Sequence, residues 1–181
     1  MSPEIRRLRN PENLDDLLNY RLFRLYASAT SPVTRLMEGK WGISRREWRL
    51  LGALAAVEQT SPSELAEQTH LDRPRTSRAI ASLVAKKLAQ RTVTADDARR
   101  ATVSLTPTGR ALFEEVFPQI ARLNTRLLEA IDDELATALD RALRALTVRA
   151  DELGISTEPE VRANRRAGGS RRVRPIPGDP Y

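Results

Sequence analysis

The chain has 181 residues, a formal net charge of +6, one histidine and no cysteine. This length suits one compact domain, or a small domain with dimerisation arms. Without cysteine, disulfides and thiolate metal sites are excluded, and a reducing cytoplasm is the natural compartment. Because His70 has no second histidine beside it, we expect neither a metal nor a cofactor. A signal peptide and a run of about 18 apolar residues are both missing, so we expect no membrane partner.

In chain order, the first expected element is a long helix from Leu14 to Glu38, where apolar residues recur at helical spacing. Pro32 lies inside this stretch and should kink or divide the helix. Gly42 breaks the pattern. Ser44, with Glu47 three residues later, forms a capping box that predicts a second helix from about Arg45 to Gln59.

The next segment predicts two helices joined by a tight turn. Ser61 is the N-cap of the first of these helices, with Pro62 at its first position. The turn falls at residues 70–72. The second helix then starts at Asp72 or Arg73 and runs to about Lys87, with a proline in its first turn.

A β-hairpin follows, in which strands at 90–94 and 101–105 flank a polar tip. Thr106 is the expected N-cap of a fifth helix that runs to about Ala130 and is interrupted at Pro118. Asp132 opens a last helix ending near Gly154. The resulting order of six helices and one hairpin predicts a mainly α fold of the winged helix-turn-helix type.

We expect four regions along the chain. Residues 1–40 form an N-terminal arm and dimerisation helix, and residues 41–106 form the DNA-binding domain. Residues 107–154 supply the C-terminal dimerisation helices. The remainder, 155–181, is rich in Arg, Pro and Gly and reads as a basic, mobile tail.

Positive charge is concentrated on the helix after the turn and on the hairpin. Residues 72–100 contain eight positive and three negative side chains, a local charge of +5. One side of the helix after the turn carries residues suited to packing, such as Ile80 and Leu83. Another side carries Arg75 and Arg78, which suit bidentate contact with guanine in a major groove. The alternative is an ordinary surface helix with solvated arginines.

The hairpin strengthens the DNA-binding interpretation. Arg99 and Arg100 at its tip can reach an adjacent minor groove, and Asp97 can orient Arg99. The alternative is a solvated tip with a weak surface ion pair. The expected DNA contacts are Ser61, Ser63, Arg73, Pro74, Arg75, Thr76, Ser77, Arg78, Ser82, Asp97, Arg99 and Arg100.

The stretch SPSELAEQTHLDRPRTSRAIASLVAKKLAQR, followed by DDARRATVSLTPTG, resembles the MarR family of bacterial transcription regulators. Its D-x-R, apolar strand and L-T-x-x-G pattern, ending at Gly109, matches the wing of that family. Two departures occur: Lys87 stands where a glycine usually ends the recognition helix, and Arg100 where a small residue is common. The resemblance implies a triangular homodimer on a pseudo-palindromic operator, usually a repressor released by a small ligand.

The last two predicted helices independently favour a dimer. Their leucine-rich faces exceed what a winged domain of about 65 residues can cover, although part of the surface serves an intrachain three-helix core. Two recognition helices of a twofold dimer would lie about one DNA turn apart, ~34 Å.

The resemblance to the MarR family implies that an effector binds between the dimer helices and the winged domain. Polar and aromatic candidates there are Tyr20, Arg24, Ser28, Arg46, Trp48 and Arg49. A buried guanidinium beside an aromatic ring would suit an aromatic carboxylate. The segment GISRREWRLLGAL also resembles family members that control aromatic-acid catabolism. A core role for Trp48, and phosphate contact or solvation for the two arginines beside it, are the alternatives.

Other classes of protein fit less well. No P-loop, dinucleotide, nucleophile-elbow or metal-ligand motif occurs, so we do not expect an enzyme. A non-specific architectural nucleic-acid-binding protein would use the same basic hairpin and tail. An interaction module could use the winged domain for protein contacts. A ligand-responsive, sequence-specific repressor is the interpretation that the residues favour.

Overall fold

The computed structural model describes residues 7–94 and 97–157, with side chains for 7–93 and 101–153. The predicted basic tail therefore lies almost entirely outside the described residues. The chain forms two compact units, Met1–Ser44 and Arg45–Tyr181, and each is described by itself.

The first unit contains a short 3-10 helix, η1 (Leu14–Asp16), and the long helix α2 (Leu18–Trp41). Asp16 is buried; its carboxylate accepts a hydrogen bond from the backbone N–H of Glu12 at 3.2 Å and pairs with Arg21 at 3.5 Å. Gly42 ends α2 in the left-handed conformation, with φ of 62°, which glycine adopts at no steric cost.

The structure differs from the predicted first helix in two details. Its first turn is the separate η1, and α2 is not divided at Pro32 but continues to Trp41. Pro32 is exposed, so its ring faces away from packed neighbours. A proline removes one backbone donor from a helix, and a helix of 24 residues retains enough hydrogen bonds to continue.

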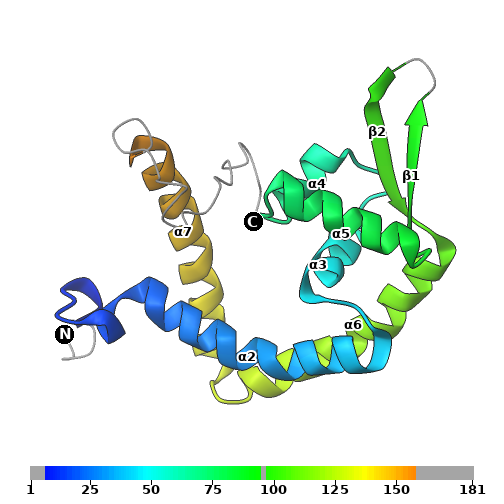
Figure 1. The fold of residues 1–181 in the computed structure, drawn as a ribbon. Coiled ribbons are helices and arrows are strands. Elements are labelled where there is room, and N and C mark those ends of the chain that lie inside the picture. The colour runs from blue at the N-terminus through cyan, green and yellow to red at the C-terminus, as the bar shows by residue number, and fades with distance from the viewer. Residues whose placement is uncertain (1–6, 95–96, 158–181) are drawn as a thin grey trace. The chain divides into compact units, whose positions relative to one another are not determined.

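In the second unit, α3 (Arg45–Ala55), α4 (Pro62–Gln68) and α5 (Arg73–Ala85) pack together, as Figure 1 shows. Leucines from α3 and α4 and the apolar side of α5 form the core. Its fully buried aliphatic side chains include Leu50, Leu51, Leu54, Leu65 and Leu83.

Helix α3 ends four residues before the predicted Gln59 because the chain must become extended at Thr60. There the backbone N–H of Thr60 donates to the Val103 carbonyl at 3.0 Å, and Val103 donates back at 2.8 Å. This bridge adds a third, very short strand segment to the base of the hairpin.

The hairpin consists of β1 (Ala89–Thr94) and β2 (Asp97–Leu105), paired antiparallel from Ala89↔Leu105 to Val93↔Ala101. An irregularity between Val93 and Thr94 lets Thr94 pair with Asp97. The second strand thus begins four residues before the predicted start at Ala101. Figure 1 shows the hairpin projecting beyond α4 and α5.

Two helices complete the unit, α6 (Pro107–Leu128) and α7 (Asp133–Thr157). The predicted interruption at Pro118 was wrong, since α6 runs through this exposed residue. Helix α7 likewise passes Gly154. Within the described residues there are six α-helices, one 3-10 helix and one hairpin, which confirms the predicted mainly α, winged helix-turn-helix fold.

Candidate nucleic-acid interface

Helix α4 begins with the capping box that the sequence predicts. The Ser61 hydroxyl accepts from the Glu64 backbone N–H at 3.2 Å, and the Glu64 carboxylate accepts from the Ser61 N–H and the Thr60 hydroxyl, both at 2.9 Å. The Ser61 backbone, then the Thr60 hydroxyl, hold the pKa of Glu64 below its ordinary value. Ser61 is therefore a cap, and Ser63 is exposed in the first turn.

A tight turn then directs the chain into α5. His70 is exposed and has a φ of 50°, a left-handed conformation, and Leu71 donates its N–H to the Ala66 carbonyl at 3.0 Å. Asp72 is the N-cap of α5, because its carboxylate accepts from the Arg75 N–H at 2.8 Å. The predicted position of the turn is confirmed.

The outward side of α5 carries the arginines singled out by the sequence. Arg73, Arg75 and Arg78 are exposed, as are Pro74 and Ser77. Nε of Arg75 pairs with Asp72 at 3.3 Å, and Nε of Arg78 donates to the Pro74 carbonyl at 3.2 Å. Both guanidinium groups are thus held close to the first turn of the helix, where recognition helices contact base edges.

The opposite side of α5 corrects two of the expected DNA contacts. Thr76 is 1% exposed, and its hydroxyl donates to the Asp72 carbonyl at 3.0 Å. Ser82 is half-buried, and its hydroxyl donates to Glu47 of α3 at 2.7 Å. These two residues face the protein because they share the helix side of the buried Ala79, Ile80 and Leu83.

The end of α5 explains the unusual lysine in the family pattern. Lys87 has a φ of 58°, a left-handed conformation that glycine adopts more easily. Here Lys87 donates its N–H to the Val84 carbonyl at 2.9 Å and Leu88 donates to Leu83 at 2.9 Å. The chain therefore makes the turn that a glycine would allow, and the left-handed backbone of Lys87 is strained.

The L-T-x-x-G pattern also has a structural cause. Thr106 is the N-cap of α6: its hydroxyl accepts from the Gly109 N–H at 3.0 Å and donates to the Lys87 carbonyl at 2.7 Å. Any Cβ at Gly109 would overlap the carbonyl of Leu88. The pattern therefore joins the start of α6 closely to the end of α5.

The wing contacts proposed from the sequence cannot be located as side chains. The backbone of residues 97–100 belongs to β2, but the side chains of Asp97, Arg99 and Arg100 lie outside the described ones. Arg91 on β1 is exposed.

The candidate effector residues divide between the two units. On α2, Tyr20 stacks on Phe23 with ring centroids 6.3 Å apart, Arg24 pairs with Asp15 at 3.1 Å, and Ser28 is exposed.

On α3, Trp48 stacks on Phe113 of α6 with centroids 5.3 Å apart, and Phe113 contacts Phe117 at 5.4 Å. Arg49 donates to the Thr69 carbonyl at 3.1 Å. Arg24, Arg46 and Arg49 are all exposed, so the expected buried guanidinium is not present among them.

The contact that sequence reasoning missed joins α3 to α5. Glu47, interpreted only as a capping residue, is buried and accepts hydrogen bonds from both Ser82 and Lys86. Among the described residues, no group of acidic, His or Cys side chains is arranged to hold a metal ion. No helix in the described ranges is long and apolar enough to span a bilayer.

Comparisons with known proteins agree with this geometry. The MarR family model matches residues 41–100. A MarR family regulator from Silicibacter pomeroyi DSS-3 is 28% identical, with a TM-score of 0.67, and the match covers 76% of this chain and 98% of that one. Bordetella bronchiseptica BpsR, studied for regulation of its DNA binding by 6-hydroxynicotinic acid, is 23% identical, with a TM-score of 0.67 and coverage of 76% and 97%.

NadR in complex with 4-hydroxyphenylacetate is 23% identical, with a TM-score of 0.61 and coverage of 72% and 92%. No curated protein sequence matches the chain. The family match spans α3, α4, α5 and the first part of the wing, the elements that present the exposed arginines. Residues 41–100, about a third of the chain, thus match the MarR family model, and the fold is similar to that of MarR family transcriptional regulators.

Proposed function

We propose that this regulator is a homodimeric repressor that binds a pseudo-palindromic operator and is released by a small aromatic carboxylate. The observation that carries the DNA-binding part is the outward side of α5. Three exposed arginines project there from a helix whose other side is buried in the core. A helix anchored on one side and cationic on the other is what major-groove reading requires.

Among the exposed groups, Arg75 and Arg78 are the proposed base-reading residues. Asp72 and the Pro74 carbonyl restrain their Nε atoms, so less side-chain entropy is lost when guanine is bound. Arg73, Pro74, Ser77, Ser61 and Ser63 are proposed to contact the phosphate backbone, and the wing residues Asp97, Arg99 and Arg100 an adjacent minor groove.

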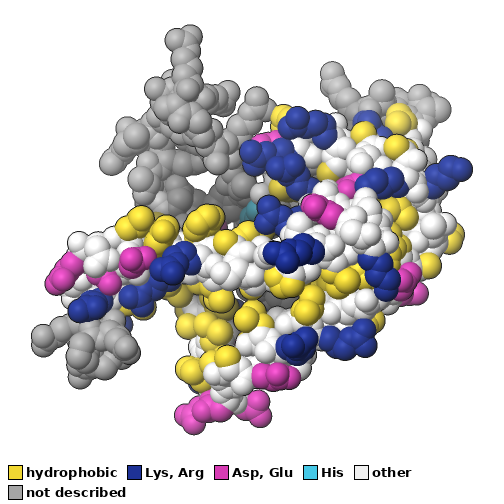
Figure 2. All heavy atoms as spheres, turned by 60° about the horizontal axis from the view of Figure 1, so that its bottom comes forward, with side chains coloured by type: hydrophobic (Ala, Val, Ile, Leu, Met, Phe, Trp, Pro, Cys, Tyr) yellow, Lys and Arg dark blue, Asp and Glu magenta, His cyan; other side chains and the backbone are white. Residues whose placement is uncertain are grey.

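The dimer is supported by the apolar surface of the terminal helices. Leucines recur on one side of α7, at Leu135, Leu139, Leu143 and Leu146, and all four are exposed in the single chain. Figure 2 shows many hydrophobic side chains at the surface of the molecule. Contiguous apolar surface of this kind marks a protein contact. We assign dimerisation to residues 107–154 together with the arm 1–40, and DNA binding to 41–106.

The effector class is supported by aromatic side chains and by related structures. Trp48, Phe113 and Phe117 form a continuous stack, with which a flat ring can pack. Both acids named with the two 23% identical neighbours carry an aromatic ring. The proposed site lies beside this stack, with Arg46 and Arg49 of the same unit as polar candidates. Tyr20, Arg24 and Ser28, in the first unit, stay candidates on the sequence alone.

Footprinting on the DNA that flanks the gene tests the DNA-binding proposal. We expect one protected, pseudo-palindromic site of about two helical turns. Replacing Arg75 or Arg78 with Ala should weaken operator binding by about 1–3 kcal/mol each and relax sequence preference. Arg122→Ala, at an exposed position of α6, is the matched control. Uniform, salt-sensitive coating of DNA would instead identify an architectural protein.

Thermal denaturation tests the effector. 6-Hydroxynicotinic acid and 4-hydroxyphenylacetate should raise Tm and lower operator affinity, since a ligand that binds the folded state stabilises it. The same acids should leave the Tm of a Trp48→Ala variant unchanged. An unaltered Tm of the wild-type protein across a panel of aromatic acids would contradict the proposed effector class.

A further inference from the structure

A buried carboxylate connects α3 to the far end of the recognition helix. Glu47 is 4% exposed. Its Oε1 accepts a hydrogen bond from the Ser82 hydroxyl at 2.7 Å and from the Lys86 ammonium group at 2.6 Å. Two donors from α5 and its C-cap therefore converge on one oxygen of α3.

The chemistry makes this connection strong. A carboxylate removed from water needs charged or hydrogen-bonded partners, because its desolvation is otherwise uncompensated. Charge-assisted hydrogen bonds such as that from Lys86 are shorter and stronger than neutral ones. Glu47 thus restrains the end of α5 to one position relative to α3.

Both ends of α5 are then fixed by carboxylates. Asp72 caps the beginning, where Arg75 and Arg78 are displayed, and Glu47 holds the last turn. The helix has 13 residues, a length of about 20 Å. A tilt of about 3° at one end would displace the other by about 1 Å, more than the range of good hydrogen-bond distances allows.

We propose that Glu47 is a positioning residue for operator recognition, acting through Ser82 and Lys86 on the orientation of α5 without touching DNA. This inference rests on the proposed DNA-binding function. It also gives Ser82, expected from the sequence to contact DNA, a different task. Glu47 affects sequence specificity because base-edge contacts need an accurate helix orientation, whereas attraction to phosphates tolerates a small tilt.

The test compares operator DNA with a scrambled duplex of equal length at several salt concentrations. For Glu47→Ala we expect operator affinity to fall about tenfold. Affinity for scrambled DNA should stay within about twofold, and the salt slope should be unchanged because no phosphate contact is lost. Lys86→Met should give the same pattern. If Lys86 instead contacts phosphate, both DNAs are bound more weakly and the salt slope falls by about 1.

Leu54→Val is the matched control, since it trims a buried side chain of the same helix and leaves the carboxylate in place. It should lower stability and keep the ratio of operator to scrambled affinity. If Glu47→Ala does not fold, Ser82→Ala carries the test, because it removes only a half-buried hydroxyl.

The double variant Glu47→Ala/Lys86→Met should bind the operator no more weakly than the weaker single variant, because both remove one connection. The inference would be overturned if the losses of operator affinity were additive in the double variant, or if Glu47→Ala left operator affinity unchanged. It would also be overturned if Leu54→Val changed the ratio of operator to scrambled affinity as much as Glu47→Ala does. Wild-type protein without sequence preference would overturn the proposed function itself, so the two failures are distinguishable.

Discussion

Helices α5 and α7 are both amphipathic, but within the single chain only α5 has its apolar side buried. Helix α5 buries Thr76, Ala79, Ile80 and Leu83 against its own domain. On α7 the leucines at 135, 139, 143 and 146 are between 39% and 54% exposed. A recognition helix must be rigid before DNA arrives, whereas an association helix gains its burial from a partner. The contrast is that expected between a reading element and an assembling one.

The strongest test of this contrast places charge on the apolar side of α7. Leu139→Asp/Leu143→Asp should convert a dimer to a monomer, because burying two unpaired carboxylates opposes association. Operator affinity should fall by a factor on the order of 100, since two linked half-sites gain from effective concentration. Sedimentation and gel-shift titration measure both effects.

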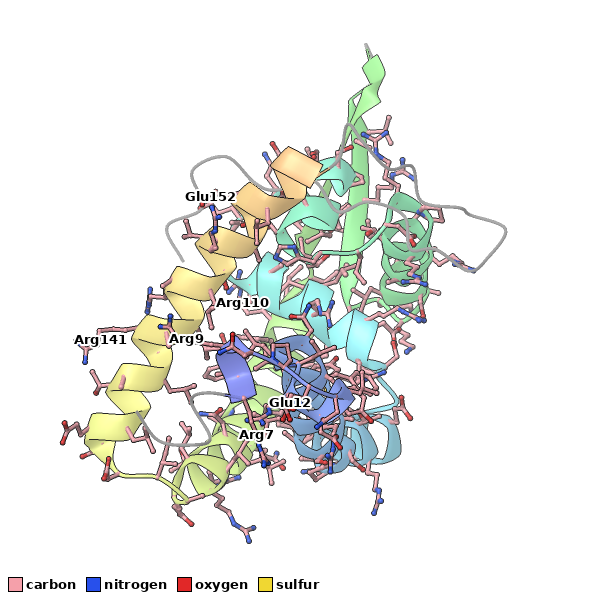
Figure 3. All side chains as sticks on the ribbon, turned by 90° about the vertical axis from the view of Figure 1, so that its left-hand side faces the viewer. Arg7, Arg9, Glu12, Arg110, Arg141 and Glu152 are labelled. Atoms are coloured by element: carbon pink, nitrogen blue, oxygen red, sulfur yellow. The ribbon has the colours of Figure 1, made fainter. Side chains whose placement is uncertain are left out.

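Arg141→Asp is the control for this variant. Arg141 lies on the other side of α7, and its side chain points outward from the helix (Figure 3). A dimer that survives the double leucine substitution, or one that Arg141→Asp also dissociates, would contradict the assignment of the leucine row to the interface.

A second test disturbs the contact between α5 and α6. Gly109→Ala should lower the free energy of unfolding by about 1–3 kcal/mol or more, because the new methyl group overlaps the Leu88 carbonyl. Gly39→Ala, a helical glycine with open space around it, should be neutral or stabilising by up to about 1 kcal/mol. Urea unfolding of both variants checks this, and equal effects would show that the close approach is not needed.

A smaller effect, of opposite sign, is expected at the end of α5. Lys87→Gly should raise the free energy of unfolding by about 1 kcal/mol, because a left-handed conformation strains a residue with a side chain. Arg122→Gly, within α6, should lower it by about the same amount. If Arg122→Gly stabilised the protein, or if Lys87→Gly destabilised it, this account of the turn would be refuted.

The smallest expected effect concerns pH and the start of α4. Hydrogen bonds from Ser61 and Thr60 keep the folded pKa of Glu64 below its ordinary value. Its contribution is therefore present above the unfolded pKa of about 4 and is lost as pH falls through the folded pKa. The Tm difference between wild type and Glu64→Gln should shrink with falling pH, and a difference that grows would contradict the capping box. Glu67→Gln, outside the box, is the matched charge control.

Local sequence patterns predicted most of the elements and several of their caps. Ser61, Asp72 and Thr106 each accept from a backbone N–H three residues ahead, so a short window contains the whole interaction. The exposed arginines of α5 followed from helical spacing alone. The effect of the prolines was overestimated from the sequence. At the exposed positions Pro32 and Pro118, α2 and α6 each lose one backbone donor and continue.

What could not be predicted depends on residues far apart in the chain. Glu47 and its partners are separated by 35 and 39 positions, and the bridge at Thr60 depends on Val103. Ser82 therefore appeared as a polar residue free to contact DNA, when it belongs to a connection that only the folded chain creates. Lysine itself carries no signal for the left-handed conformation of Lys87, which was indicated only by the resemblance to a family with glycine at this position.

The Asp72 carboxylate has a consequence for how DNA is selected. Helix N-termini attract phosphate groups through their free N–H donors and positive dipole. At α5 this position is already taken by an acidic side chain, which pairs with Arg75 and repels nearby phosphates. With the proposed base-reading role of Arg75, we expect random duplex to meet a partly neutralised helix end, while a guanine opposite Arg75 would offer a replacement partner. On this proposal, sequence discrimination at this end of the helix depends as much on weakened attraction to phosphates as on contacts with the bases.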